Sequence, residues 1–294
     1  MPSVRGFGPL ALAAMLLLGA PAGAQVAPSL ADVEYARAEG QPLLLDLYLP
    51  RTEGATLLVW VHGGAWQRGS KADMPLAELV ERGYAIASVE FRQATAARFP
   101  AQLHDIKAAI RFLRARAGEY GYDAERVGVL GASSGGHLAA LVGATSGDAE
   151  LEGEIGAHRG ESSAVQAAVS FFGASNLTTI LKQSTPLGLR VREPALQLLL
   201  GDAPDQAVAV AELASPVFHV DANDPPLLLL HGDQDPQMPI NQAHELDGAY
   251  SALGHDVRLV VVHGAAHGGA QFFDAERLAL VEEFLARTLR ADST

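Results

Sequence analysis

The stretch GVLGASSGGHLAA contains two adjacent serines, Ser133 and Ser134, among glycines and alanines. A serine on a sharp strand-to-helix turn can act as a nucleophile, provided that the residues two before and two after it are small. Gly131 and Gly135 meet this condition for Ser133, whereas Ser134 has the bulkier Ala132 two positions before it and would lie inside the helix. We therefore predict that Ser133 is the nucleophile. The alternative is a glycine-rich turn capped by a serine, without chemistry.

A second small-residue stretch, His62-Gly63-Gly64-Ala65-Trp66, directly follows an apolar run. Such a loop at the carboxyl end of a strand lets backbone N–H groups converge on a developing negative charge. We expect the N–H groups of Gly64 and Ala65, together with that of Ser134, to form an oxyanion hole. The sequence leaves open whether Gly63 donates in place of one of them.

A serine nucleophile needs a base, and the base needs a carboxylate to orient it. With a nucleophile on a strand-to-helix turn, the chain order is serine, acid, histidine. His267 lies in the glycine-rich stretch after the last apolar run and is the predicted base. The preceding apolar run leads into HGDQDP, in which Asp235 is the predicted acid. Asp233, in the same stretch, is interpreted as a turn-forming carboxylate that binds local backbone N–H groups.

Apolar, β-branched runs alternate with segments of helical period along most of the chain, which predicts a scaffold for these residues. Continuous apolar strands alternating with helices indicate an α/β fold, with a mostly parallel sheet covered by helices on both faces. No helical stretch separates the first two strands, so the amino-terminal edge is expected to be antiparallel. The predicted strands are 43–48, 57–61, 84–91, 127–130, 167–172, 227–230 and 257–262, and the clearest helical faces lie within 103–113 and 278–289.

Two segments, 146–165 and 174–215, interrupt the alternation and are rich in Gly, Ser, Pro and mixed charge. We interpret them as small cap insertions near the active site, with a short helix at 195–200 in the second. Surface decoration is an equally good interpretation of the first segment. Without internal repeats or a linker, residues 25–294 are expected to form a single domain.

Composition excludes several classes of function. The net charge of −13 disfavours nucleic acid and anionic membrane surfaces as partners. There is no His-Glu-x-x-His motif, no P-loop, no dinucleotide fingerprint and no cysteine, so we predict neither a cofactor nor a metal. A zinc site at His263 and His267 is a weak alternative, because no carboxylate stands at a helpful spacing.

The amino terminus has the pattern of a targeting segment. Arg5 precedes a short apolar run, and Ala22-Gly23-Ala24 forms a small-x-small cleavage site. We predict a signal peptide over residues 1–24, cleaved after Ala24, and export to a bacterial periplasm or medium without stable membrane insertion. The alternative is an uncleaved anchor or an interfacial helix.

Several motifs together resemble a known family. The stretches HGGAW with QRGSK, FPAQLHDIKAAIRFLR, GASSGGHLAAL, PPLLLLHGDQD and GAAHG are similar to those of the α/β-hydrolase serine esterases, most of all the bifunctional feruloyl and acetylxylan esterase-like branch, which is related to the hormone-sensitive-lipase type. The resemblance runs over nearly all of residues 30–290. It implies an α/β-hydrolase fold, a triad of Ser133, Asp235 and His267, and structural roles for Asp105 and for 214–216. The chain departs from the family pattern at Ala65, Met238 and Asn176.

The expected function is that of an exported serine carboxylic-ester hydrolase that works through an acyl-enzyme. The resemblance suggests acetyl, feruloyl or other short-chain esters, either small molecules or esters linked to polysaccharide. An arylformamidase or a peptidase would use the same triad, and a catalytically silent binding module would share the fold. Nothing in the sequence predicts the oligomeric state.

Overall fold

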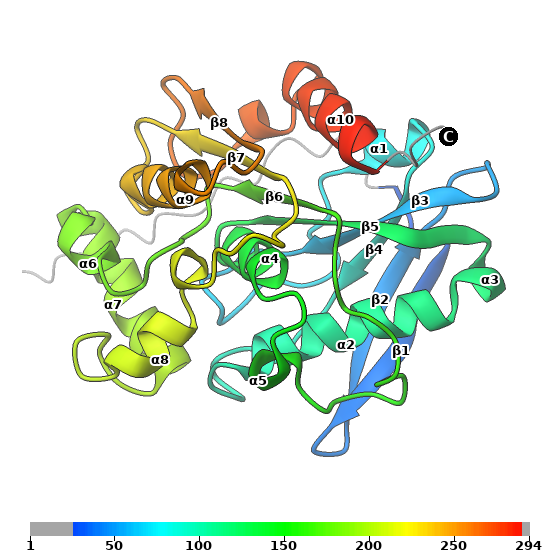
Figure 1. Ribbon diagram of the computed structural model, residues 1–294, viewed down its shortest axis with the longest axis horizontal. Helices are drawn as coiled ribbons and strands as arrows, with labels where there is room; N and C mark the ends of the chain where they lie inside the picture. The colour runs from blue at the N-terminus through cyan, green and yellow to red at the C-terminus, as the bar shows by residue number, and fades with distance from the viewer. Residues whose placement is uncertain (1–25, 290–294) are drawn as a thin grey trace, which may run out of the picture.

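The scaffold is an eight-stranded sheet in the order β1-β2-β4-β3-β5-β6-β7-β8. The computed structural model describes residues 26–289, shown in Figure 1. The predicted signal peptide and its cleavage site lie outside these residues. The strands are β1 (Leu30–Ala38), β2 (Gln41–Tyr48), β3 (Ala55–Val61), β4 (Ala85–Val89), β5 (Tyr122–Ala132), β6 (Ala167–Phe171), β7 (Leu227–Gly232) and β8 (Val257–Val262).

Strand pairing confirms the predicted mostly parallel sheet with an antiparallel amino-terminal edge. β3 pairs in parallel with β4 and with β5, and the parallel pairing continues through β6 and β7 to β8. β2 runs antiparallel to both β1 and β4. β1 was not expected from the sequence. The consequence for the site is that the carboxyl ends of β3, β5, β6, β7 and β8 all meet at one edge of the sheet.

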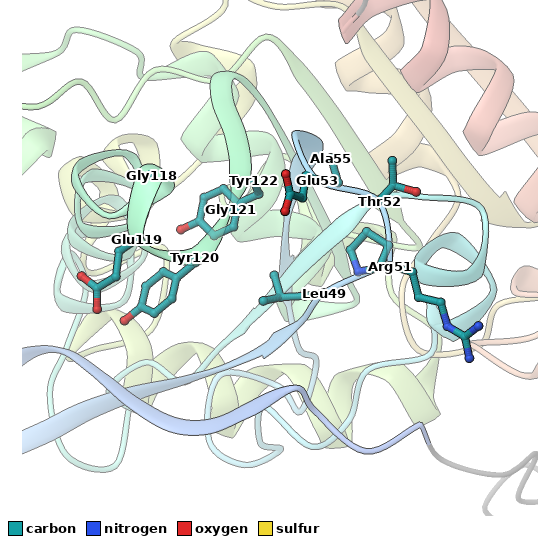
Figure 2. A pocket seen from close by; sticks show the side chains of 11 residues that line it. Leu49, Arg51, Thr52, Glu53, Ala55, Gly118, Glu119, Tyr120, Gly121 and Tyr122 are labelled. Carbon is teal, nitrogen blue, oxygen red and sulfur yellow. The ribbon is translucent and has the colours of Figure 1, made fainter.

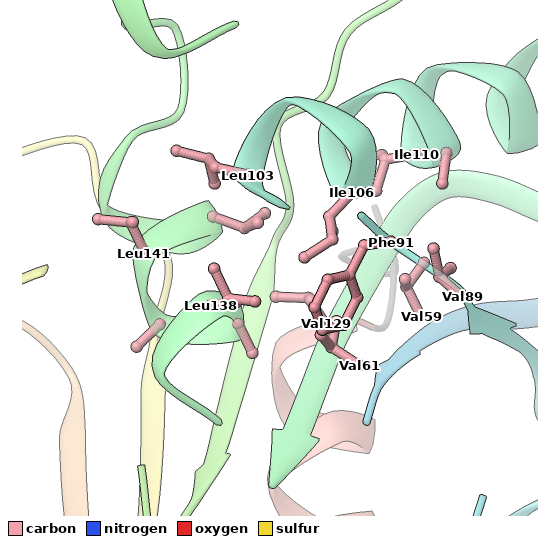
Figure 3. Packing of buried hydrophobic residues seen from close by; sticks show 14 of the residues in the cluster. Val59, Val61, Val89, Phe91, Leu103, Ile106, Ile110, Val129, Leu138 and Leu141 are labelled. Atoms are coloured by element: carbon pink, nitrogen blue, oxygen red, sulfur yellow. The ribbon is translucent and has the colours of Figure 1, made fainter. Parts of the chain in front are cut away.

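Helices cover both faces of this sheet, as the apolar periodicity predicts. Alternate residues of β3 point to opposite faces, so Val59 packs in the core on one face and Leu58 in the core on the other. Helix α2 (Ala101–Ala115), α4 (Ser134–Ala144) and α9 (Asn241–Ala252) cover the first face, and α1 (Ala77–Glu81) and α10 (Ala275–Leu289) the second. Figure 3 shows the first core, where side chains of α2 and α4 meet those of β3, β4 and β5.

Shorter helices complete the fold. These are α3 (Ala117–Tyr120), α5 (Ala149–Glu152), α6 (Ile180–Gln183), α7 (Pro186–Leu200) and α8 (Val208–Leu213), with short 3₁₀ turns at Pro216–Phe218 and Ala270–Phe272. Among the helices of residues 26–289, none is both long and apolar enough to cross a bilayer.

The second insertion, 174–215, is more helical than the sequence predicts. A short helix was expected at 195–200, but α7 begins at Pro186 and runs through Pro194. A proline inside a helix removes one backbone hydrogen bond, here to the carbonyl of Arg190. Both Arg190 and Pro194 are exposed. Water can therefore solvate the freed carbonyl, which makes the interruption tolerable.

The first insertion, 146–165, does not lie near the predicted site. Its contacts are with α2: Arg111 donates to the carbonyl oxygens of Glu152 and Ile155, both at 3.0 Å. Helix α4 separates this insertion from Ser133, and its 11 residues carry the chain about 16 Å away. The expectation that 146–165 caps the site is therefore wrong, and surface packing against α2 is its observed role.

Two segments that the resemblance assigned to structure are tied into the fold. The buried carboxylate of Asp105 accepts hydrogen bonds from the backbone N–H and the guanidinium of Arg92, at 2.9 and 2.7 Å. The buried hydroxyl of Ser215 accepts from the N–H of Leu177 at 2.8 Å and donates to the carbonyl of Ala211 at 2.5 Å. Both residues fix loops next to the carboxyl edge of the sheet.

Candidate active site

Ser133 lies on a sharp turn between β5 and α4. Its backbone has φ 55° and ψ −119°, a conformation that is strained for a residue with a Cβ atom. The N–H of Ser133 donates to the carbonyl of Phe171 at 2.9 Å, which ties the turn to the end of β6. Strain of this kind persists only where surrounding contacts hold it.

Glycines on either side make the turn possible. A Cβ atom at Gly131 would lie 2.2 Å from the carbonyl oxygen of Gly135, and one at Gly135 would lie 2.1 Å from that of Val61. Both distances are far inside van der Waals contact. Positions 131 and 135, which the sequence pattern predicts to be small, therefore accept no side chain larger than that of glycine.

Three side chains that are distant in sequence form one hydrogen-bonded chain. The hydroxyl of Ser133 lies 2.9 Å from Nε2 of His267, and Nδ1 of the same ring lies 2.6 Å from Oδ2 of Asp235. The neighbouring hydroxyl of Ser134 is fully buried and has no hydrogen-bond partner in the described part of the chain. The structure therefore brings the predicted serine, acid and histidine together, in the frame that selects Ser133.

The acid is held as an anion by its hydrogen bonds. Burial raises the pKa of Asp235, but hydrogen bonds from His267 and from the backbone N–H groups of Met238 and Gln237 outweigh this effect and lower it. The two backbone N–H groups each donate to Oδ1 at 2.8 Å. Because Oδ1 is committed to the loop, Oδ2 is left facing the imidazole.

The competing residues in the same loops are paired elsewhere. Asp233 accepts from the N–H of Gly264 and from Nδ1 of His263, both at 2.8 Å, at the exposed surface. Both partners belong to the loop that follows β8, so Asp233 joins two loops and does not bind the local backbone N–H groups that its interpretation as a turn-forming carboxylate predicts. His137 is buried within α4 and its ring accepts the indole N–H of Trp66 at 3.1 Å, so this ring packs inside the fold and is not hydrogen-bonded to the hydroxyl of Ser133.

The loop 62–66 lies against the serine turn. A Cβ atom at Gly63 would be 3.4 Å from the Cβ of Ser133, so this backbone passes directly beside the hydroxyl-bearing residue. Gly64, Ala65 and Trp66 all have positive φ, at 116°, 56° and 60°. Within residues 26–289, the N–H groups of Gly64 and Ala65 donate to no protein acceptor.

His62 orders this loop. Its ring stacks on Phe91 with centroids 4.5 Å apart, and its Nδ1 lies 2.8 Å from the carbonyl oxygen of Gly63. Burial lowers the pKa of His62, although the hydrogen bond to Gly63 opposes this. The ring donates its Nδ1–H to that carbonyl and so fixes the backbone at the start of the loop.

Comparison with known proteins agrees with this architecture. Residues 45–250 match the BD-FAE family. The chain belongs to the BD-FAE family. It is 32% identical over 232 residues to the esterase LipC of Mycobacterium tuberculosis, a match that covers 76% of this chain and 56% of LipC. The chain spans about half the length of the curated relatives it matches.

Solved esterase structures share the fold. A truncated carbohydrate esterase from gut microbiota superposes with a TM-score of 0.81 and 30% identity, covering 92% of this chain and 99% of that one. An esterase of Thermogutta terrifontis with bound propionate gives a TM-score of 0.71 and 27% identity, covering 89% and 96%. These likenesses confirm the predicted α/β-hydrolase fold of this BD-FAE chain.

Three further residues lie at the site and were not predicted. The ring of Phe172 packs edge-on against His267 with centroids 5.0 Å apart. His231 is buried beside Asp235, 3.6 Å from Oδ2. Arg192 of α7 reaches His267 from the second insertion, with Nη2 at 3.5 Å from Nε2. The repeat of HG at 231–232 and 263–264 marks two strand ends, but no local pattern identifies Arg192.

Other features of this BD-FAE chain lie apart from the triad. In the described chain, no three His, Cys, Asp or Glu side chains are grouped to hold a metal ion. A surface hollow of about 250 Å³ is lined by residues 49–53, 55 and 118–122 (Figure 2). Because it adjoins the amino ends of β3 and β5, it faces the opposite edge of the sheet from Ser133.

Proposed function

We propose that this protein is a serine carboxylic-ester hydrolase. The observation that carries the proposal is the continuous chain from the Ser133 hydroxyl to His267 at 2.9 Å and on to Asp235 at 2.6 Å. A nucleophile, a base in hydrogen-bond contact with it and an acid that orients the base are the parts that acyl transfer needs. The esterase relatives make an ester the preferred substrate over an amide or a formamide.

The first half-reaction forms an acyl-enzyme. Nε2 of His267 takes the proton of Ser133 as Oγ attacks the ester carbonyl carbon, and the carbonyl oxygen becomes an oxyanion. When the intermediate collapses, the bond to the alcohol oxygen breaks and His267 returns the proton to that oxygen. A water molecule then repeats the cycle on the acyl-serine, so that the acid leaves and the hydroxyl of Ser133 is restored.

The oxyanion is assigned to backbone N–H groups. Ser134 begins α4, and the first N–H groups of a helix have no intrahelical acceptor. The N–H groups of Gly64 and Ala65 in the adjacent loop likewise have no protein acceptor among the described residues. Donors that are already oriented stabilise the oxyanion without reorganising.

Asp235 fixes the tautomer of the base. Its Oδ2 accepts the Nδ1–H of His267, which leaves the Nε2 lone pair facing Ser133. When Nε2 takes the proton, the carboxylate stabilises the imidazolium. Because hydrogen bonds lower the pKa of Asp235, it remains ionised throughout the neutral range.

The proposed substrates are esters of short or aromatic acids, including acetyl and feruloyl esters on polysaccharide. Support comes from the carbohydrate esterase neighbour and from the propionate bound to the Thermogutta terrifontis enzyme. We also propose export to the periplasm or the medium, on the signal-peptide pattern of residues 1–24. A silent binding module would have no need for a complete serine–histidine–aspartate chain.

A fluorophosphonate probe tests the nucleophile directly. We expect mass spectrometry to find the adduct on Ser133, and expect Ser133→Ala to abolish both labelling and hydrolysis of p-nitrophenyl acetate. Ser251→Ala, at an exposed position of α9, is the matched control and should retain both. An adduct on Ser134, or full hydrolysis by Ser133→Ala, would overturn the assignment. Rates on p-nitrophenyl acetate, butyrate and octanoate, methyl ferulate and acetylated xylan then rank the acyl groups.

A further inference from the structure

Arg192 places a buried positive charge beside the base. It extends from α7, is only 1% exposed, and brings Nη2 to 3.5 Å from Nε2 of His267. On its other side, the guanidinium carbon lies 6.0 Å from the ring centroid of Trp66, in the loop that carries the proposed oxyanion hole. The charge therefore lies between the base and the oxyanion loop, within reach of a substrate bound at Ser133.

The hydrogen-bonding capacity of this guanidinium is largely unused. Nε donates to the carbonyl of Gln237 at 3.2 Å, whereas Nη1 has no acceptor among residues 26–289. Nη2 faces Nε2 of His267, whose single lone pair already accepts the hydroxyl of Ser133 at 2.9 Å. Two of the three nitrogens thus lack an acceptor of their own at a buried position, where polar groups are normally satisfied.

Among residues 26–289, no carboxylate is paired with this charge alone. Burial lowers the pKa of Arg192 to about 10, with the negative charge of Asp235 opposing this, so the side chain stays cationic at neutral pH. Asp235 is already committed, since its oxygens accept from His267, Gln237 and Met238. A buried cation without a partner is unfavourable for folding, which points to a partner that arrives with the ligand.

The position of Arg192 is fixed before any ligand binds. Helix α7 docks on the loop of the acid, where Thr185 donates to the carbonyl of Pro236 at 2.5 Å. Close approach is required at Gly188, because a Cβ atom there would lie 3.0 Å from the same carbonyl oxygen. A donor group that is already held in place loses little freedom when it binds.

We propose that Arg192 binds a carboxylate of the substrate and makes this enzyme selective for esters that carry a carboxylate close to the ester bond. The planar guanidinium presents parallel N–H groups that match a carboxylate, which a neutral acyl group does not. Because Arg192 lies next to the base, the carboxylate must lie within a few bonds of the ester. Monoesters of short dicarboxylic acids and acyl esters of hydroxy acids have this form. The inference rests on the proposed esterase function.

Matched substrate pairs test the proposal. Monoethyl succinate and its neutral amide, ethyl succinamate, have nearly the same shape and place the test group on the acyl side. O-acetyl lactate and O-acetyl lactamide place it on the alcohol side. We expect kcat/KM for the carboxylate member of one pair to exceed that of its amide by roughly 10- to 100-fold. This is the factor that a hydrogen bond to a charged group contributes.

Variants assign this preference to the residue. Arg192→Gln should lower kcat/KM for the preferred carboxylate ester by roughly 10- to 100-fold more than kcat/KM for its amide, and so remove the preference. Arg192→Lys keeps the charge but lacks the parallel N–H groups of the guanidinium, so it should keep part of the preference for the carboxylate ester. Arg190→Gln, at an exposed position on the same helix, is the matched control and should keep all of it.

The outcomes separate this inference from the proposed function. Absence of p-nitrophenyl acetate hydrolysis by the wild-type protein would refute the esterase itself. Hydrolysis of that ester with equal rates on both members of each pair would overturn the role of Arg192 alone, and this measurement needs no variant. An equal loss on carboxylate and amide substrates in Arg192→Gln would likewise overturn it, because it would indicate a structural role.

Discussion

Replacing Gly131 by alanine tests whether the serine turn is as tightly packed as its geometry indicates. The added Cβ would lie 2.2 Å from the carbonyl oxygen of Gly135, so the two must separate by about 1.2 Å to reach ordinary contact at 3.4 Å. Both atoms belong to the turn that holds Ser133, and relief of the contact must displace its hydroxyl from His267. A misplacement of about 1 Å costs roughly 100-fold in rate. This corresponds to about 2.7 kcal/mol of lost transition-state stabilisation.

Gly128→Ala is the matched control, since it adds the same methyl group to the same buried strand. Its Cβ would meet side-chain atoms, Leu58 Cδ2 at 2.9 Å and Leu289 Cδ1 at 3.2 Å, which can rearrange without moving the turn. Both variants should lose about 1–3 kcal/mol of unfolding free energy through overpacking. Only Gly131→Ala should lose activity beyond its loss of stability.

The assay is kcat/KM for p-nitrophenyl acetate, corrected for active sites titrated with a fluorophosphonate probe, alongside urea denaturation of each variant. We expect about 1% of wild-type kcat/KM for Gly131→Ala and near wild-type values for Gly128→Ala. Wild-type kcat/KM in a folded Gly131→Ala protein would refute the argument, because it would mean that the residue two before the nucleophile need not be small.

The remaining predictions concern charge and protonation. Asp235→Asn should lower kcat by about 10⁴-fold, because an amide no longer fixes the tautomer of His267, and a loss below about 10-fold in single-turnover measurements would contradict the role of the acid. Burial lowers the pKa of His137 from 6.5 to about 4. The unfolded state therefore binds more protons in this window, and the free energy of unfolding should fall by about 3 kcal/mol as pH drops from 6.5 to 4. His137→Gln should flatten this decline in urea titrations at several pH values. Burial raises the pKa of Asp224 to about 6, so its ionised form opposes folding above that pH. Asp224→Asn should add about 1 kcal/mol of stability at pH 8, after allowance for its exposed part, and nothing at about pH 2, well below the ordinary pKa of 3.8, where the carboxyl group is protonated in both states.

The parts of the site that are set by local sequence could be predicted. Gly131 and Gly135 supply the small residues that the frame of Ser133 requires, and the motif alone reveals them. Asp235 and His267 follow the ends of β7 and β8, and the carboxyl ends of neighbouring parallel strands necessarily meet at one edge. The contacts among the three side chains therefore follow from strand order, whereas their catalytic roles remain proposals.

The parts that depend on tertiary packing could not be predicted. β1 has mostly exposed residues and carries charges, so it has no apolar run to mark it, and its pairing with β2 stabilises it. Arg192 lies on a helix that the sequence indicated only at its last turn, because Pro194 suggests a break. Its position beside the base depends on the docking of α7 against Pro236, which involves no motif.

The edge position of β8 makes the region around His267 less stable than the rest of the protein. Within residues 26–289, this strand pairs only with β7 at the end of the sheet, and most of its residues are partly exposed. Five residues later the chain supplies the imidazole. Local fraying needs less energy than global unfolding, so heat would detach the proton acceptor while the rest of the molecule kept its helices. On warming, hydrolytic activity should therefore decrease at a lower temperature than the circular dichroism signal of the helices. A covalent cross-link between β7 and β8 should move this loss of activity to a higher temperature.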